Sequence, residues 1–378
     1  MDIKERKEDI LVSVNGCSKI ESLQALRALA FLSIFLFHAH GPFIMVYFAV
    51  TVFFVLSGFL LMYRHGEEDG PVSVTDNLRF AAKKISGIYP LHIITMLISV
   101  GWYIALMILK GDVLKRILNL FICLGFNITL TQSWIPIDEI NVSLNGVAWY
   151  LSVIVFLYFL FPWISRLIRR INKTSFLIPV CAVLLLMQIL ISAVTLDKSY
   201  GTWATYIFPV FRVADFFTGC SFGYIYRNRK SAGQSVAVAT VIEVLAVAIT
   251  VSVELWKNAV HVGTIARSIN NRTTLYILLA VLWIWLFAER RGVITKLLSN
   301  RYLIGLGNIS AYTYLIHFVF TQYTTFALNF FDITGRGIWT LAIVFEFAAT
   351  LIATTIYVNL EKKYKILRLS ERIFSMKA

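Results

Sequence analysis

Charged side chains are scarce in this sequence. Only 15% of its 378 residues are Asp, Glu, Lys or Arg, whereas soluble domains carry roughly 25%. Apolar residues make up 58% of the chain, and the mean hydropathy is +0.74. This composition excludes an ordinary soluble domain and predicts an integral membrane protein. The net charge of +14 then indicates topology and not nucleic-acid binding, because every basic stretch lies in a short loop between apolar segments.

Cysteine is also rare, and no cleavable signal is present. The four cysteines are isolated, with no Cys-x-x-Cys pair and no metal-ligand spacing. We therefore expect no disulfide framework, no zinc site and no other metal site. Residues 1–21 mix both charge signs and precede no small-residue cleavage site, so we expect the first apolar segment to remain as a membrane anchor.

Ten apolar segments are long enough to cross a bilayer. They lie near residues 22–40, 43–63, 89–109, 146–164, 176–196, 207–226, 235–254, 273–288, 303–327 and 337–360. We predict an all-α fold, a polytopic bundle of ten transmembrane helices, with no internal repeat. Segment 113–132 is a weaker candidate, because it contains Lys115, Arg116, two Asn and a Gln.

The distribution of basic residues indicates the topology. With ten spans and a cytoplasmic N-terminus, 25 of the 35 Lys and Arg residues lie in inside segments and 8 in outside loops. An eleventh span would reverse the later loops, so we predict that 113–132 is a re-entrant or interfacial helix. The expected organisation is a cytoplasmic segment 1–21, one membrane domain at 22–360 and a basic cytoplasmic tail at 361–378, in the inner (cytoplasmic) membrane of the cell.

The longest inside loop is expected to form a short helix. Residues 64–88 contain "NLRFAAKKI", a basic amphipathic pattern suited to the membrane surface. Thr75 and Asp76 are the expected N-caps of this helix.

Two ionisable side chains share one face of the first segment. Arg27 and His38 are eleven residues apart, so their directions differ by about 20° on a helix and their heights by about 16 Å. An ionisable residue within a span indicates a functional site unless it snorkels or is paired. We expect Arg27 near the cytoplasmic mouth of one tunnel and His38 further along the same wall. His40 is about 200° from His38 and is expected to point elsewhere.

The pattern Arg, ten residues, His resembles the signature of the acyltransferase-3 family, bacterial membrane O-acyltransferases that modify surface polysaccharides and related acceptors. Four further stretches resemble that family in order and spacing. They are "FFVLSGFLLM" (53–62), "WYLSVIVFLYFLFP" (149–162), "PVFRVADFFTGCSFGY" (209–224) and "SAYTYLIH" (310–317). The resemblance covers the chain from about Ser22 to Leu360.

The resemblance implies an acyl-coenzyme A donor, with acetyl-CoA expected, that binds from the cytoplasm as a co-substrate; no tightly bound cofactor is implied. Arg27 and the basic helix around Lys83 and Lys84 are expected to bind its phosphates. His38 would meet the thioester, either as a general base for an acceptor hydroxyl or as a nucleophile that carries the acyl group. The sequence does not choose between these two mechanisms.

The chain departs from the family pattern at several positions. Where relatives have two arginines three residues apart before Tyr-Pro, "KKISGIYP" (83–90) has Lys84 at the first position and Gly87 at the second. Lysine keeps the charge but lacks the bidentate geometry of arginine, and Lys83 offers a compensating charge. A Glu that often follows the Trp-x-Leu-Ser stretch is absent here, and Asp215 stands where Glu is common.

Further polar residues are candidates for acceptor binding. Arg212 and Asp215, three residues apart, form either a structural ion pair or an acceptor-binding pair. Ser310, Tyr314 and His317 share one helix face, and their spacing favours hydrogen bonds between helices over a place in the site.

Two more candidates lie at the outer edge of the fourth span. Trp149, with Asn145 beside it, is expected in an interfacial aromatic belt or stacked on a sugar ring. Ser57 and Gly58 in the second span form a small-residue packing point.

The predicted function is an acyl-CoA-dependent O-acyltransferase. Its expected partners are the acyl-CoA donor, a carbohydrate or lipid-linked glycan acceptor and the lipid bilayer, with no nucleic acid. The alternative is a transporter or flippase in which Arg27 and His38 line an anion path, although matching interrupted helices are absent. A membrane sensor that has lost catalysis is a third possibility.

Overall fold

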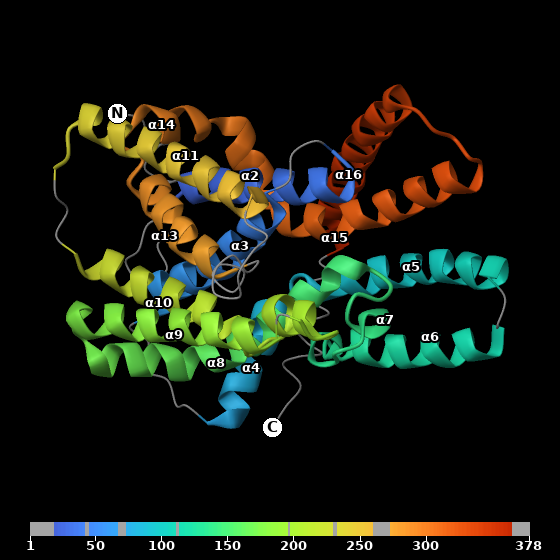
Figure 1. Cartoon of the computed structure of the whole chain (residues 1–378), viewed down its shortest axis with the longest axis horizontal. Coiled ribbons are helices and arrows are strands. Elements are labelled where there is room, and N and C mark those ends of the chain that lie inside the picture. The colour runs from blue at the N-terminus through green and yellow to red at the C-terminus, as the bar shows by residue number, and fades with distance from the viewer. Residues whose placement is uncertain are drawn as a thin grey trace.

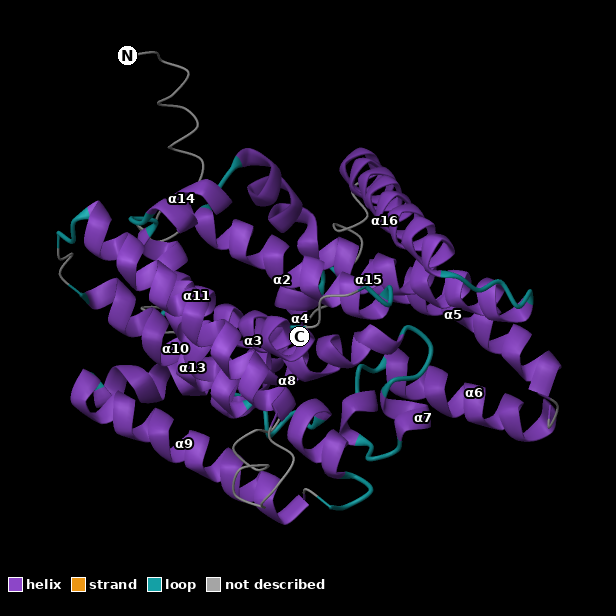
Figure 2. Cartoon of the chain, turned by 45° about the horizontal axis from the view of Figure 1, so that its top comes forward, coloured by secondary structure: helices purple, strands orange, loops and turns teal. Residues whose placement is uncertain are grey.

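The computed structural model describes residues 19–41, 45–66, 73–110, 113–195, 197–229, 233–259 and 273–364. Every regular element in these ranges is a helix, as Figure 2 shows. The longer helices are α2 (Ser22–His38), α3 (Val46–His65), α4 (Val74–Ile85), α5 (Tyr89–Lys110), α6 (Val113–Ile128), α8 (Trp149–Ile171), α9 (Thr174–Thr195), α10 (Val213–Asn228), α11 (Val236–Ala259), α13 (Thr274–Glu289), α15 (Arg301–Phe330) and α16 (Arg336–Tyr364). The short ones are η1 (Gln132–Trp134), α7 (Asp138–Asn141), η2 (Gly146–Ala148), η3 (Trp203–Ile207) and α14 (Val293–Leu298).

All ten predicted segments fall on helices, and the all-α polytopic class is confirmed. Seven helices among the described residues are long and apolar enough to span a membrane, namely α3, α5, α8, α9, α11, α15 and α16. The other three, α2, α10 and α13, have 16 or 17 residues. At 1.5 Å per residue they are about 24–26 Å long, slightly less than a bilayer core of about 30 Å. The count of ten spans therefore stays a prediction.

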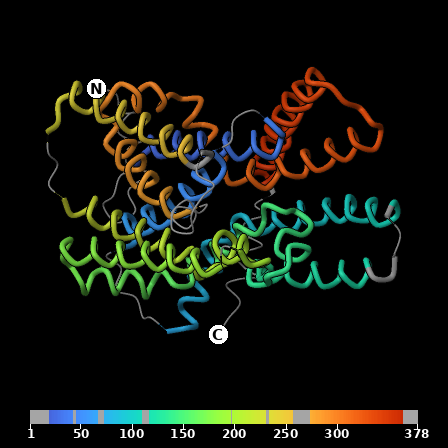
Figure 3. The backbone as a smooth tube through the Cα atoms, in the orientation of Figure 1, coloured from blue at the N-terminus to red at the C-terminus, as the bar shows by residue number. Residues whose placement is uncertain are grey.

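Helices α2 and α3 lie in the middle of the molecule, as Figures 1 and 3 show. Helices α8, α9 and α10 cover one side of them, and α11, α13 and α14 another. Two hairpins, α5–α6 and α15–α16, extend toward the end of the molecule opposite to α9, α11 and α13 (Figure 1). The first span is thus surrounded by helices from distant parts of the sequence.

The central helices pack with their backbones in contact. A Cβ at Gly58 of α3 would lie 2.2 Å from the Phe216 carbonyl oxygen, and one at Gly219 of α10 would lie 2.0 Å from that of Val55. The packing role predicted for Gly58 is confirmed. At Gly307 of α15, a Cβ would lie 1.8 Å from the Gln24 carbonyl oxygen of α2. These contacts fix α3 against α10 and α2 against α15.

The weak segment 113–132 forms a separate helix, α6, which runs antiparallel beside α5 (Figures 1 and 3). A helix on the membrane surface would cross a spanning α5 at a steep angle. The observed direction does not fit the interfacial form of this prediction, and the re-entrant form stays a prediction.

The predicted basic amphipathic helix is present as α4, and it packs against α8. Its N-cap is Ser73, whose hydroxyl accepts a hydrogen bond of 3.1 Å from the Asp76 amide. The expected caps Thr75 and Asp76 are therefore wrong. The helix begins one turn earlier than its apolar pattern indicated, because Ser73 satisfies a first-turn amide that would otherwise be unpaired.

We expect Gly219→Ala to lower the free energy of unfolding by about 1–3 kcal/mol, because the new methyl group must displace the α3 backbone. Gly305→Ala on α15 is the matched control, since nothing lies within 4 Å of its Cβ position. It should be neutral or raise stability by about 0.5–1 kcal/mol. Thermal unfolding in detergent micelles measures both, and equal melting temperatures would contradict the packing assignment.

Candidate functional site

A cavity of about 290 Å³ lies between α2, α3, α4, α8 and α15. We call it the basic cavity. Its polar lining residues are Arg27, Ser57, Arg64, His65, Lys84, Tyr150, Tyr158, Ser310 and Tyr314, and the remainder are apolar. The described residues that line it include three cations and no carboxylate, so its chemistry suits a polyanion.

The cations come from three helices. Arg27 lies in the second turn of α2, Arg64 and His65 in the last turn of α3, and Lys84 in the last turn of α4. Basic side chains at helix C-termini are favoured by the helix dipole. The Lys84 Nζ lies 2.9 Å from the His65 Nε2 and 5.2 Å from the centre of the Phe80 ring. The ends of two helices thus bring their cations toward the side chain of Arg27.

Sequence reasoning found part of this set. Arg27 and Lys84 line the cavity as expected, whereas Lys83 is exposed and is not among the lining residues. Arg64 and His65 were missed. They form a basic pair at the inner end of the second span, and such a pair indicates topology in a sequence without showing whether it also lines a cavity.

His38 lines a different cavity, of about 580 Å³, which we call the histidine groove. Its lining residues are His38, His40, Trp102, Leu106, Leu109, Val142, Phe318, Thr321, Gln322, Thr325, Phe326, Asn329 and Phe330. They come mainly from α5 and α15, and the two histidines are the only ionisable groups among these described lining residues. The lining is largely apolar and aromatic, with hydrogen-bonding groups along one face of α15.

His40 lies in this groove too, and the expectation that it points elsewhere is wrong. Helix α2 ends at His38, and His40 has a φ of 55°. A helical rotation of 100° per residue therefore no longer applies after residue 38. The ring of His40 lies 5.2 Å from that of Trp339.

The expectation of a single tunnel shared by Arg27 and His38 is also wrong. The two side chains open into separate cavities, because α15 covers the part of α2 between them. The ring of His317 on α15 lies 5.7 Å from that of Phe31 and 6.2 Å from that of Phe35. Tyr314, on the same helix, lines the basic cavity. Side chains of α15 thus form a partition between the two spaces.

The stripe of Ser310, Tyr314 and His317 is part of the site region. Ser310 and Tyr314 line the basic cavity, and both are also tied to backbone. The Ser310 hydroxyl donates to the Gly307 carbonyl (2.8 Å), and the Tyr314 hydroxyl to that of Val147 (3.1 Å). Tyr314 thus makes the predicted hydrogen bond between helices, and both residues also face the cavity.

Asn145 and Trp149 lie in the protein interior and line neither cavity. The Asn145 side-chain amide donates a 2.9 Å hydrogen bond to the Leu315 carbonyl, which connects the start of η2 to α15. Trp149 is 7% exposed and packs 5.0 Å from the Tyr206 ring. This burial is incompatible with an aromatic belt at the lipid interface.

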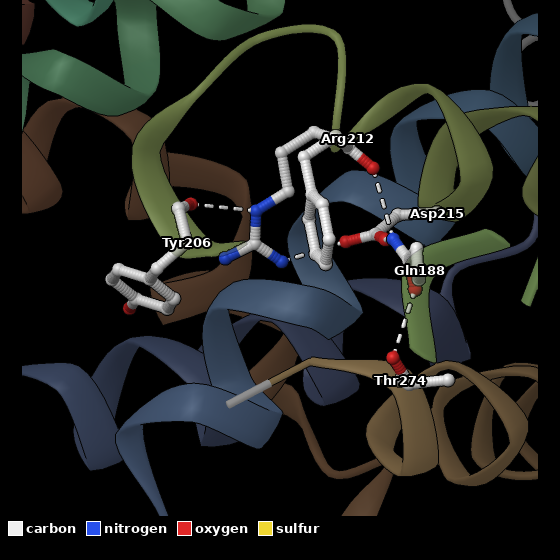
Figure 4. A network of polar contacts seen from close by, with 6 residues as sticks. Gln188, Tyr206, Arg212, Asp215 and Thr274 are labelled. Atoms are coloured by element: carbon white, nitrogen blue, oxygen red, sulfur yellow. Dashed lines mark hydrogen bonds and ion pairs between the residues drawn. The ribbon is translucent and has the colours of Figure 1, made fainter. Parts of the chain in front are cut away.

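Arg212 and Asp215 form a fully buried ion pair, drawn in Figure 4. Arg212 Nη1 lies 2.7 Å from Asp215 Oδ2, and Arg212 Nε donates to the Tyr206 carbonyl at 2.8 Å. Gln188 donates to Asp215 Oδ1 at 3.0 Å and accepts from Thr274 at 3.2 Å. The network joins α9, α10 and α13 and lines neither cavity, which favours the structural alternative for the pair.

Among the described residues no group of His, Cys, Asp and Glu side chains could hold a metal ion. The molecule is thus a polytopic all-α membrane protein in which a basic cavity and a histidine groove meet at a partition formed by α15.

Sequence comparison gives the family of this protein. A family model described as an acyltransferase domain matches residues 20–358, and the chain belongs to this acyltransferase-3 family. The chain is also 35% identical over 125 residues to "Acyltransferase MdmB" from Streptomyces mycarofaciens. That alignment covers 32% of this chain and 29% of the relative's length. No solved structure matches the chain.

The structural role of the ion pair gives a prediction. Arg212→Met leaves the Asp215 carboxylate buried without its cation, and we expect this to cost about 3–5 kcal/mol of unfolding free energy. The double variant Arg212→Met/Asp215→Leu removes both charges and should recover most of that loss. Size-exclusion chromatography after graded heating in detergent measures the folded fraction. A double variant no more stable than the single one would contradict a structural pair.

Proposed function

We propose that this protein is a membrane O-acyltransferase that moves an acyl group from acyl-CoA to a hydroxyl of a glycan or glycan precursor. Family membership and the name of the partly matching relative support acyl transfer. The observation that carries the donor assignment is the basic cavity, where Arg27, Arg64 and Lys84 lie together among the described lining residues.

The donor occupies the basic cavity with its phosphates against these cations. Coenzyme A is strongly anionic at one end and carries its thioester at the end of a long thin arm. Arg64 and Lys84 both lie within the predicted cytoplasmic segment 64–88, at the C-terminal ends of α3 and α4, which suits a donor from the cytoplasm. The hydroxyls of Ser57 and Tyr150 offer hydrogen bonds to the amides of the arm. Acetyl is the expected acyl group.

The reaction centre is His38, at the boundary of the histidine groove. Its neutral imidazole takes the proton of the acceptor hydroxyl as the oxygen attacks the thioester carbon. Alternatively, it accepts the acyl group itself and passes it to the acceptor. In either case the two substrates approach the partition from opposite cavities.

The acceptor enters through the histidine groove. Trp102 provides a flat face for a sugar ring, and Thr325 and Asn329 provide hydrogen-bonding groups on the opposite helix. The apolar side chains of Leu106 and Phe330 suit the chain of a lipid-linked acceptor. The groove therefore fits an uncharged, hydroxyl-bearing headgroup on an apolar carrier in the inner membrane.

His38→Ala should reduce acyl transfer by about 10²–10⁴-fold, because the general base or nucleophile is lost. His40→Ala should cost less than about 10-fold, since His40 lines the groove without the role of proton acceptor. Release of free coenzyme A from acetyl-CoA, in membranes that contain the acceptor, measures both. Equal effects of the two substitutions would contradict the assignment of His38. Movement of acceptor across the membrane without thioester loss would instead support the transporter alternative.

Arg27→Gln, Arg64→Gln and Lys84→Gln should each raise the KM for acetyl-CoA by roughly 10-fold or more, because a charge-assisted hydrogen bond contributes about 1.5–3 kcal/mol. Lys83→Gln is the matched control, since Lys83 neighbours Lys84 in sequence but is exposed outside the cavity lining. Initial rates over a range of donor concentrations give the KM values. Equal KM increases for Lys83→Gln and Lys84→Gln would exclude a specific donor site.

A further inference from the structure

His317 is a buried imidazole with one nitrogen in use and one nitrogen unpaired. Its side chain is 0% exposed, and its Nδ1 lies 3.2 Å from the Thr313 carbonyl oxygen. A carbonyl oxygen only accepts, so Nδ1 carries the hydrogen in this contact. In the neutral ring, Nε2 is then an acceptor, and it has no hydrogen-bond partner within the described part of the chain. Such an unpaired buried acceptor costs free energy, and it leaves Nε2 available to take up a proton.

This imidazole lies between the two cavities. Its ring centre is 5.5 Å from that of His38, which lines the histidine groove, and 5.8 Å from that of Tyr314, which lines the basic cavity. A nitrogen–nitrogen hydrogen bond or a single bridging water can span the separation of the two histidines. The neighbouring rings of Phe31 and Phe35 are apolar.

The proposed reaction requires a proton to cross this partition. In the transfer from thioester to hydroxyl, the carbon–sulfur bond breaks and a carbon–oxygen bond forms. The hydroxyl loses its proton on the groove side, where His38 takes it. The coenzyme A thiolate, which forms on the side of the basic cavity, must gain one proton to leave as a thiol. The acyl group and the proton therefore move in opposite directions across the partition formed by α15.

We propose that His317 is the positioning and relay residue for this proton. Its unpaired Nε2 accepts the proton from His38 and returns it to the leaving thiolate, while the Thr313 carbonyl keeps Nδ1 protonated. The charge balance closes, since one proton leaves the acceptor oxygen and one reaches the sulfur. This inference rests on the proposed function, because it assumes a donor in the basic cavity and an acceptor in the groove.

The test varies the need for a proton on the leaving group. The donors are acetyl-CoA and S-acetyl-5-thio-2-nitrobenzoate, whose aryl thiolate is stable without protonation. Thiol release and transfer of labelled acetyl are measured in membranes of the protein's own host, with each variant replacing the native copy. His317→Gln should lower the maximal rate with acetyl-CoA about 100-fold or more, with KM within about 2-fold of wild type. With the aryl thioester, the same variant should lose less than about 3-fold in rate.

Two variants complete the comparison. His38→Gln should slow both donors, because the acceptor proton must be removed in each reaction. His92→Gln is the matched control, since His92 is a buried histidine on α5 with a backbone contact to Asn127 and lines neither cavity. It should leave the ratio of the two rates unchanged. Equal slowing of both donors by His317→Gln, or no slowing of either, would overturn the relay.

A measurement on the unmodified protein covers the case in which His317→Gln does not fold. The solvent deuterium isotope effect should be larger with acetyl-CoA than with the aryl thioester, because only the first donor requires the second proton transfer. Equal isotope effects would overturn the relay. If the wild-type protein transfers acetyl from neither donor, the proposed function itself fails.

Discussion

The site depends on the close crossing of α15 over α2. At Gly307 the two backbones touch, because a Cβ there would overlap the Gln24 carbonyl. This contact brings the following turns of α15 along the inner face of α2. Ser310 and Tyr314 consequently reach the cavity that contains Arg27, and His317 lies against Phe31 and Phe35.

The protein handles ionisable groups within apolar helices in two ways. Arg212 is neutralised by Asp215 and fully buried, so its contribution is rigidity between α9, α10 and α13. Arg27 instead opens into a cavity lined by further cations and hydroxyls. Gathering like charges costs free energy in the absence of an anion. A polyanion bound in the cavity would offset part of that cost, so the cavity favours an anionic ligand over a neutral one.

Periodicity in the sequence located the helices and the face shared by Arg27 and His38, but not what packs on that face. Two residues on one side of a helix share a cavity only if no other helix covers the stretch between them, and α15 does so here. The same limit applies to His40, because the helical rotation ends with the helix at His38. Arg64 was overlooked for another reason. A basic residue at the inner end of a span satisfies the topology pattern equally well whether it faces water or a ligand.

In the proposed function, the separation of the two substrates has a chemical consequence. A thioester in contact with water is exposed to hydrolysis, and a partition of Phe31, Phe35 and Tyr314 would keep bulk water from the acyl carbon of the proposed donor. A sealed partition, however, also prevents water from supplying protons to the leaving group. A protein that excludes water from this partition must therefore place a proton carrier within the partition itself. His317 is the imidazole within this partition. A partition that excludes water needs a proton carrier of its own, and the buried histidine is placed to be that carrier.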